Sequence, residues 1–120
     1  MSTRNRGAAI PLQSEVWDVD LNPTVGREQA GTRPALIVSD DSLNRSARDL
    51  VIVAPITGTI RGFPTHVPVH PPEGGLMKPS VILVENVRSV SKARLIRRRG
   101  VVSAGTMGQV KHILRIVLDL

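Results

Sequence analysis

The sequence predicts a small, mainly β domain, in which about five to seven short, mostly antiparallel strands form a β-barrel and a single helix follows at the C-terminus. Short apolar or alternating segments are separated by turn-rich segments along most of the 120 residues, which is typical of all-β domains. Helical periodicity is confined to the C-terminal segment. With one Trp, one Phe and no Tyr, the core must be aliphatic.

The first predicted strand is Glu15 to Leu21, where apolar and acidic residues alternate. One face carries Trp17, Val19 and Leu21, and the other carries Asp18 and Asp20. A period of two is the pattern of a half-buried strand. Asn22-Pro23 ends this strand, because proline cannot donate to a ladder.

Two continuous apolar runs, Pro34 to Ser39 and Leu50 to Ile56, predict interior strands. Pro55 lies near the end of the second run and suggests an edge or a bulge there. The polar segment between them, Asp40 to Asp49, predicts a loop or one short helical turn, because its first residues favour a helix start.

The second half of the chain predicts three further segments. Thr65 to His70 alternates weakly, and Pro68 makes it an edge strand. Ser80 to Val90 is the longest strand-like segment, with room for a bend near Asn86. Ser91 to Gly100 predicts a basic turn or a short helix.

The C-terminal segment predicts one amphipathic helix that ends at about residue 118. Ser103 is a suitable N-cap. Met107, Val110, Leu114 and Val117 then recur at a helical spacing that places them on one face. We expect this face to pack against the strands.

Length and composition indicate a single domain over residues 14–120, preceded by a flexible arm over residues 1–13 that shows no periodicity. The absence of Cys excludes disulfides, thiolate metal sites and a Cys nucleophile, and it fits a reducing cytoplasm. No uncharged stretch approaches the ~20 residues that span a bilayer. We therefore expect no membrane association and no export signal.

The net charge of +6 is unevenly distributed. Residues 61–120 hold 10 of the 16 Lys and Arg but 3 of the 10 Asp and Glu. A basic half favours a polyanionic partner, nucleic acid first, although a solvated basic face would also explain it. The densest charge, at Arg94, Arg97, Arg98 and Arg99, could likewise follow a phosphate backbone or form only a solvated turn.

Arg33 and Thr57 are the candidates for binding an anion. Arg33 lies where a glycine-containing loop enters a buried strand, and its guanidinium offers a planar fork of donors suited to phosphate. The alternative is a salt bridge to Glu28 or a nearby Asp. Thr57 follows the third strand and precedes Gly58, so its hydroxyl could reach a bound anion, although Thr is also common in strands.

A metal site is not expected. His66 and His70 would share one face of an extended segment, but a third ligand and a flanking carboxylate at suitable spacing are missing. No phosphate-binding glycine motif or nucleophile-elbow motif is present, so we expect no cofactor.

One long motif resembles a known family. The run Asn22-Pro23-Thr24-Val25-Gly26-Arg27-Glu28-Gln29-Ala30-Gly31-Thr32-Arg33-Pro34 is similar to the signature Asp-Pro-x-x-Gly-x-Glu-Gln-x-Gly-x-Arg-Pro of the MazF/PemK (Kid) toxin endoribonucleases. The resemblance continues through Val53 to Thr57, Phe63 to Val67 and Ser80 to Val90. It covers nearly the whole chain, from about residue 15 to 118.

The resemblance implies an SH3-like β-barrel that forms a homodimer and cleaves single-stranded RNA without metal at short sequence motifs. It implies a toxin of a type II toxin–antitoxin system, acting on mRNA in the cytoplasm and bound by a MazE-like antitoxin with an acidic, disordered tail. Arg33 and Thr57 match catalytic positions of the family, and Glu28 matches a residue implicated in some members. We expect further RNA contacts from Arg27, Gln29, Thr32, Thr59, Arg61, Glu85 and Arg88.

The chain departs from the family pattern at a few positions. Ser14 replaces the usual Gly before the first strand, and we expect little cost there. Leu83 and Glu85 stand where Kid-type members have a catalytic Arg and Asp, and Arg27 stands where they have a reactive His. The chain is therefore more similar to the MazF type.

Two other functions remain compatible with such a fold. A CcdB-like gyrase poison would act through the end of its C-terminal helix and would not need Arg33. A non-catalytic nucleic-acid-binding barrel would use the basic surface alone.

Overall fold

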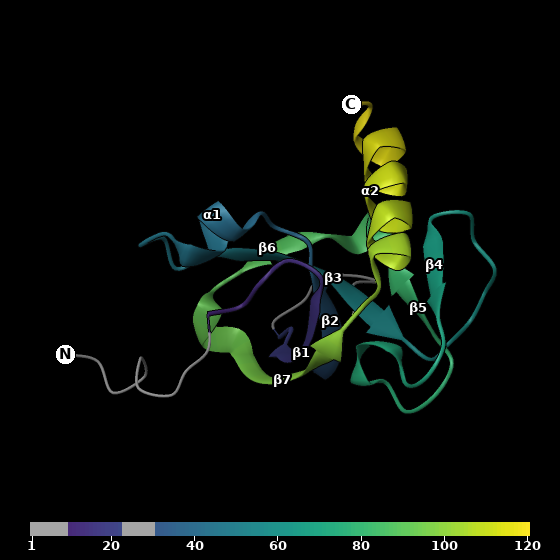
Figure 1. Ribbon diagram of the computed structural model, residues 1–120, viewed down its shortest axis with the longest axis horizontal. Helices are drawn as coiled ribbons and strands as arrows, with labels where there is room; N and C mark the ends of the chain where they lie inside the picture. The colour runs from purple at the N-terminus through teal and green to yellow at the C-terminus, as the bar shows by residue number, and fades with distance from the viewer. Residues whose placement is uncertain (1–9, 23–30) are drawn as a thin grey trace.

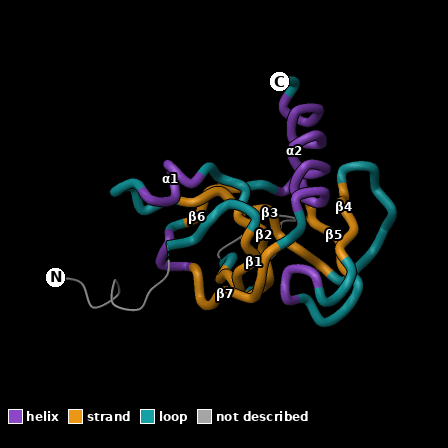
Figure 2. Tube along the Cα trace, viewed as in Figure 1, coloured by secondary structure: helices purple, strands orange, loops and turns teal. Residues whose placement is uncertain are grey.

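The computed structural model describes residues 10–22 and 31–120, and it is mainly β (Figures 1 and 2). The strands are β1 (Glu15–Asp20), β2 (Thr32–Ile37), β3 (Val51–Thr57), β4 (His66–Val69), β5 (Ser80–Leu83), β6 (Arg88–Val90) and β7 (Leu95–Val101). The helices are α1 (Asp41–Arg45) and α2 (Ala104–Leu118), with short 3₁₀ turns η2 (Glu73–Gly75), η3 (Val84–Asn86) and η4 (Lys92–Arg94).

The strands form one antiparallel sheet in the order β4-β5-β3-β2-β1-β7, and β6 pairs with β3 beside this path. The sheet is barrel-like but open, because β4 and β7 are its two ends in the described part of the chain. The predicted fold class, a mainly β domain with a C-terminal helix, is confirmed. The predicted edge position of β4 is confirmed as well.

β3 is an interior strand, as its apolar run predicted, so of the two expectations for Pro55, an edge or a bulge, the edge is wrong. Along one edge β3 pairs with β2. Along the other edge it pairs with β6 from Val51 to Val53 and with β5 at Ile56 and Thr57. Pro55 lies in the gap between these two ladders, where the lack of an N–H costs least. The proline therefore marks a change of partner within the strand.

Two hydrophobic clusters occupy the two faces of the sheet. Trp17, Val19 and Leu21 belong to one cluster, which confirms the predicted alternation of β1. The continuous apolar runs are buried on both faces: in β2, Ala35 and Ile37 join the cluster of Trp17, while Leu36 between them joins the other cluster. The cluster of Leu36 also receives Met107 and Val110 of α2.

α2 begins after Ser103, whose side chain accepts a hydrogen bond from the Thr106 N–H at 3.1 Å, and it ends at Leu118 as predicted. Only its first half is well packed: Met107 and Val110 are buried, whereas Val117 is 40% exposed. The C-terminal half stands clear of the sheet in Figure 1. Within the described residues, no helix has the length and apolar character required to cross a membrane.

The connections follow the sequence signals in two places. Asp40 caps α1 by accepting a hydrogen bond from the Ser42 N–H at 2.9 Å, so one short helical turn forms there as predicted. The bend expected near Asn86 is η3, which separates β5 from β6.

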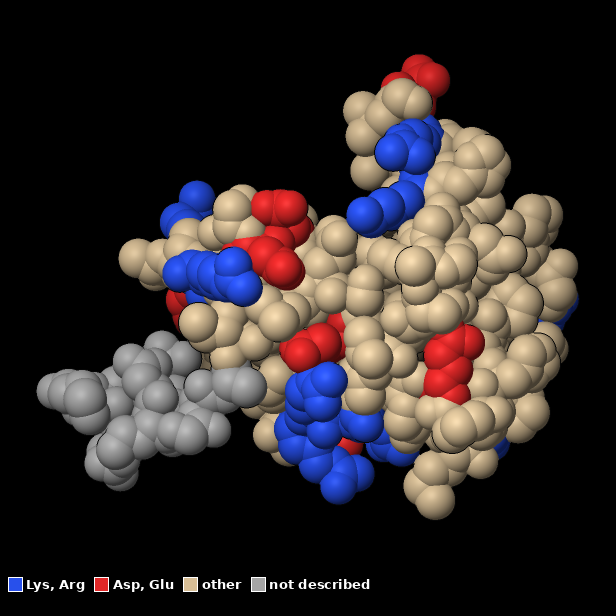
Figure 3. Space-filling view, in the orientation of Figure 1, with Lys and Arg blue, Asp and Glu red and all other residues tan. Residues whose placement is uncertain are grey.

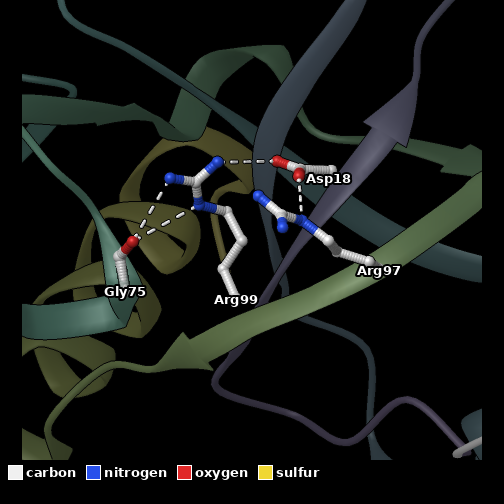
Figure 4. A network of polar contacts seen from close by, with 4 residues as sticks. All are labelled: Asp18, Gly75, Arg97 and Arg99. Carbon is white, nitrogen blue, oxygen red and sulfur yellow. Dashed lines mark hydrogen bonds and ion pairs between the residues drawn. The ribbon is translucent and has the colours of Figure 1, made fainter.

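The basic segment Ser91 to Gly100 is neither a turn nor a helix throughout, because after η4 it forms β7 alongside β1. Basic side chains gather over β7 beside acidic ones (Figure 3). Asp18 of β1 accepts from Arg97 Nε and from Arg99 Nη1, both at 3.0 Å, and Arg99 also donates to the Gly75 carbonyl (Figure 4). The run of arginines shows no alternation that would predict a strand. Its acidic cross-strand partner, Asp18, lies about 80 residues earlier in the chain, so no local pattern indicates the pairing.

Glu15 binds a third arginine of this strand and is the buried acid of the seam between β1 and β7. Its Oε2 accepts from Arg98 Nε at 2.7 Å. Its Oε1 accepts from the indole Nε1 of Trp17 at 3.0 Å and from the Leu12 N–H at 2.9 Å. A buried carboxylate needs such partners, because an unpaired charge in the interior is costly.

Ser14 has a left-handed backbone, with φ of 80°. Its N–H donates to the Ile37 carbonyl at 3.0 Å and its carbonyl accepts from the Val102 N–H at 2.9 Å, so this conformation is fixed by both neighbouring strands. Just before it, the side-chain amide of Gln13 donates to the Val38 carbonyl at 2.9 Å. Replacing the family's Gly at position 14 therefore costs more than the sequence suggested.

Glu73 of η2 links the β7 side of the sheet to the start of α2. Its Oε2 accepts from the Ser103 N–H at 2.8 Å and from the Thr106 hydroxyl at 2.6 Å. The Thr106 hydroxyl, and then the Ser103 N–H, hold the pKa of the Glu73 carboxyl below its usual value of 4.5.

We predict that Ser14→Gly stabilises the protein by about 0.5–1 kcal/mol. A side chain in the left-handed region costs about 1–2 kcal/mol, and part of this gain is offset because glycine loses more conformational entropy on folding than serine does. Urea unfolding of both proteins measures the change. Ser89→Gly, at an ordinary position of β6, is the matched control and is expected to lower stability. Equal effects of the two changes would contradict a strained Ser14.

We predict that Glu73→Gln lowers the free energy of unfolding at pH 7 by about 1 kcal/mol, since a charged acceptor of two hydrogen bonds becomes neutral. The folded pKa of Glu73 is depressed, so its contribution is present above pH about 4.5 and is lost as the pH falls further. The stability gap between wild type and variant should therefore narrow below pH 4.5 in unfolding experiments. A gap that stays constant between pH 7 and pH 3 would contradict this assignment.

Candidate active site

Arg33 and Thr57 lie at the same end of two neighbouring strands. The ladder between β2 and β3 runs from Ile37 opposite Val53 to Ala35 opposite Pro55. Two residues further along the same register come Arg33 on β2 and Thr57 on β3. Residues two apart in a strand share a face, so both side chains belong to one face of the sheet. Extending the register therefore places these two residues, 24 apart in the sequence, at one end of the two strands.

The hydroxyl of Thr57 is held in place. Thr57 is the last residue of β3, is 8% exposed, and pairs with Val81 of β5. Its Oγ1 accepts a hydrogen bond from the Thr59 N–H at 3.1 Å. A hydroxyl that accepts one bond can still donate its own proton, so Thr57 can offer a donor to an anion at the end of β3.

Arg33 lies at the exposed beginning of β2, whose burial increases from Thr32 towards Ile37. Its backbone is fixed opposite Val19 of β1. The position therefore combines a rigid strand with an exposed side chain. This is the geometry expected for an arginine that contacts a ligand from a fixed base.

The remaining candidates differ in their surroundings. Arg88 of β6 lies opposite Val53 and donates Nη1 to the Leu21 carbonyl at 3.1 Å, so it secures the end of β1. Thr32 is the exposed first residue of β2, and Thr59 and Arg61 are exposed in the loop after β3. Three candidates, Arg27, Gln29 and Glu28, lie outside the described residues.

Glu85 is engaged by a histidine. Its Oε2 lies 2.9 Å from Nε2 of His66 on β4. Partial burial raises the pKa of the Glu85 carboxyl, but hydrogen bonds from His66, from its own N–H and from Thr65 outweigh burial and hold the pKa below its usual value. Glu85 is thus a charged partner of His66, with Phe63 against the edge of the same imidazole at 5.2 Å between ring centres.

His66 is therefore occupied by a carboxylate rather than paired with His70. Across residues 10–22 and 31–120, no group of three His, Asp or Glu side chains is placed to hold a metal ion. Of the site residues predicted from the sequence, Arg33 and Thr57 bring a guanidinium and a hydroxyl to the end of β3.

One cation near this site was missed by sequence reasoning. The side chain of Lys78, from the loop before β5, lies against Gly58, the residue that follows Thr57. No local motif connects the two positions, and only the pairing of β5 with β3 brings them together.

Comparison with known proteins places the chain in a family. Residues 12–118 match the family model of PemK-like, MazF-like toxins of type II toxin–antitoxin systems. The chain is 35% identical over 113 residues to endoribonuclease MazF9 of Mycobacterium tuberculosis (strain ATCC 25618 / H37Rv), covering 90% of this chain and 96% of that protein.

Solved structures agree with this match. The crystal structure of MazF (Form-I) from Deinococcus radiodurans has a TM-score of 0.83 at 25% identity, covering 93% of this chain and 99% of that one. An endoribonuclease in complex with its cognate antitoxin, from a mycobacterial species, has a TM-score of 0.76 at 29% identity, covering 92% and 96%. The chain belongs to the PemK-like, MazF-like toxin family of type II toxin–antitoxin systems.

Proposed function

We propose that the protein is a toxin that acts as a sequence-specific endoribonuclease on single-stranded RNA, mRNA in particular, and thereby inhibits translation and growth. The observation that carries this proposal is the placement of Arg33 and Thr57 at one end and on one face of β2 and β3. The relative named as an endoribonuclease, at 35% identity, supports the reaction class. Its place of action would be the cytoplasm, where mRNA is found.

Cleavage would proceed by attack of the adjacent 2′-oxygen on the scissile phosphorus. The new P–O2′ bond forms as the P–O5′ bond breaks, the 2′-hydroxyl loses its proton to a base, and the leaving 5′-oxygen gains one. The products are a 2′,3′-cyclic phosphate, or the 3′-phosphate derived from it, and a 5′-hydroxyl. The protein must supply positive charge and hydrogen-bond donors where negative charge develops on the phosphoryl oxygens.

Arg33 and Thr57 match that requirement. The guanidinium of Arg33 would neutralise the developing charge, since arginine stays protonated at any working pH. The Thr57 hydroxyl would donate to a phosphoryl oxygen and fix the register of the RNA, because its own acceptor bond to the Thr59 N–H already orients it. Glu28, outside the described residues, remains our candidate for the base.

The RNA would continue over exposed residues around this strand end. Thr32 lies next to Arg33 on β2, and Thr59 and Arg61 follow Thr57 in the loop after β3. Arg88, whose Nη1 donates to the Leu21 carbonyl, would bring a positive charge to the same RNA. Arg27, Gln29 and Glu85 complete the set of contacts that we propose.

Assembly would use the uncovered part of α2. Its last turns expose aliphatic side chains, and an open groove of about 530 Å³ lies between β4 and the small residues Gly105 and Gly108. We propose a homodimer and a cognate antitoxin with an acidic, disordered tail attracted to the basic half of the chain. A solved relative in complex with its antitoxin supports the second partner.

We predict that Arg33→Ala lowers the rate of RNA cleavage by about 10²–10³, the usual loss when one preorganised donor is removed. The assay is gel analysis of cleaved RNA in the presence of EDTA, with end sequencing to define the motif. Arg48→Ala, at an exposed position after α1, is the matched control. Cleavage by folded Arg33→Ala at the wild-type rate would exclude this role, and wild-type protein that leaves all RNA intact would favour a gyrase poison or a simple binding barrel.

We predict that Thr57→Val lowers kcat by about 10–100-fold and lowers stability by about 1 kcal/mol, because valine keeps the shape but removes the hydroxyl that accepts from the Thr59 N–H. Thr57→Ser should recover most of the rate, since it restores the donor. Single-turnover cleavage and thermal unfolding of the three proteins separate chemistry from folding. A serine variant as slow as the valine variant would contradict a donor role.

A further inference from the structure

Gly58 leaves space that a lysine fills. A Cβ built at Gly58 would lie 2.5 Å from Cε and 2.9 Å from Nζ of Lys78, closer than real Cβ contacts allow. The backbone of Gly58 is not in the left-handed region, so conformational freedom does not explain glycine at this position. A side chain at this position would instead displace the flexible end of Lys78.

The backbone of Lys78 is fixed as well. The Ser80 hydroxyl donates to the Lys78 carbonyl at 2.9 Å, and Ser80 is the buried first residue of β5. Pro79 between them restricts the chain further. Val81, the next residue of β5, pairs with Thr57. The lysine therefore approaches the end of β3 from an anchored strand start rather than from a free loop.

Cations consequently flank the end of β3 from both sides. Arg33 comes from the start of β2 along one edge, and Lys78 precedes β5 along the other. The Lys78 ammonium has no hydrogen bond or ion pair to any residue that the structure describes. A lysine that lies against a backbone glycine and pairs with no carboxylate of residues 10–22 and 31–120 can offer its three donors to a ligand.

We propose that Lys78 is an RNA-binding residue of this site, and that its ammonium binds the RNA phosphate held by Thr57 from the side opposite Arg33. The proposal rests on the proposed function. Lysine suits this task as a compact point charge that binds a phosphate oxygen without a fixed planar geometry. Gly58 then leaves the space that the end of the Lys78 side chain occupies.

The test uses the full chain and a short RNA containing the cleavage motif, with a 2′-deoxy nucleotide at the scissile position so that it binds but cannot react. Lys78→Met should weaken binding roughly tenfold, as expected for one charge-assisted hydrogen bond. It should also reduce the slope of log K against log salt by about 0.7, the value for one neutralised phosphate of a single strand. Lys78→Arg should restore the slope. Lys111→Met, on the exposed side of α2, is the matched control and should change neither quantity.

Gly58→Ala is a second variant. It keeps the lysine in the sequence, but the added methyl group occupies the space in which the end of the Lys78 side chain lies. It should weaken binding as Lys78→Met does, and the double variant should be no weaker than the single ones, because both act on one contact. Full affinity and an unchanged salt slope in Lys78→Met, or losses that add in the double variant, would overturn the proposal. Wild-type protein that cleaves no RNA would refute the nuclease function, whereas the binding data with the unreactive RNA would still decide the role of Lys78.

Discussion

A proline within an interior strand is the constraint on which the arrangement of this protein depends. Along one edge, β3 pairs with β6 before Pro55 and with β5 after it. Along the opposite edge, it pairs with β2. The strand therefore contributes to both hydrophobic clusters and connects the two parts of the open sheet. The same change of partner brings the starts of β2 and β5 beside the end of β3. That end, with Thr57, is where the candidate site lies.

The charge of the molecule is organised by strand pairing rather than by local runs. Arginines of β7 are bound to Asp18 and Glu15 of β1, so the densest basic segment in the sequence is partly neutralised. The cations that matter for an anion are instead dispersed along the chain and gathered by the sheet. Arg33 and Lys78 are separated by 45 positions, yet they flank one strand end.

Much of the fold was predictable from the sequence because its signals are local. The alternation of β1, the Asp40 and Ser103 caps and the bend at η3 each depend on a few consecutive residues. The strand at β7 was not predictable, because its arginines find acidic partners far away in the sequence. The interior position of Pro55 depends on where two ladders end, and that is a property of the assembled sheet.

The candidate site divides in the same way. Arg33 was recognisable because it stands at the junction of a glycine-containing loop and a buried run, and Thr57 because it follows a strand and precedes Gly58; family resemblance then matched both to catalytic positions. The sequence could not show that the strand register places both on one face. Nor could it show that Glu85 is held by His66, or that Gly58 is in contact with a lysine. These are tertiary contacts without a local pattern.

The bonding of Trp17 has a practical consequence for spectroscopy. It is the single tryptophan of a chain without tyrosine, it is 7% exposed, and its indole donates to Glu15, which in turn binds Arg98. Intrinsic fluorescence of this protein therefore originates from one site, the seam between the first and last strands. Changes in the emission of Trp17 would report the separation of β1 from β7. Comparing them with a probe of the whole fold would show whether these two strands separate before the rest of the protein unfolds.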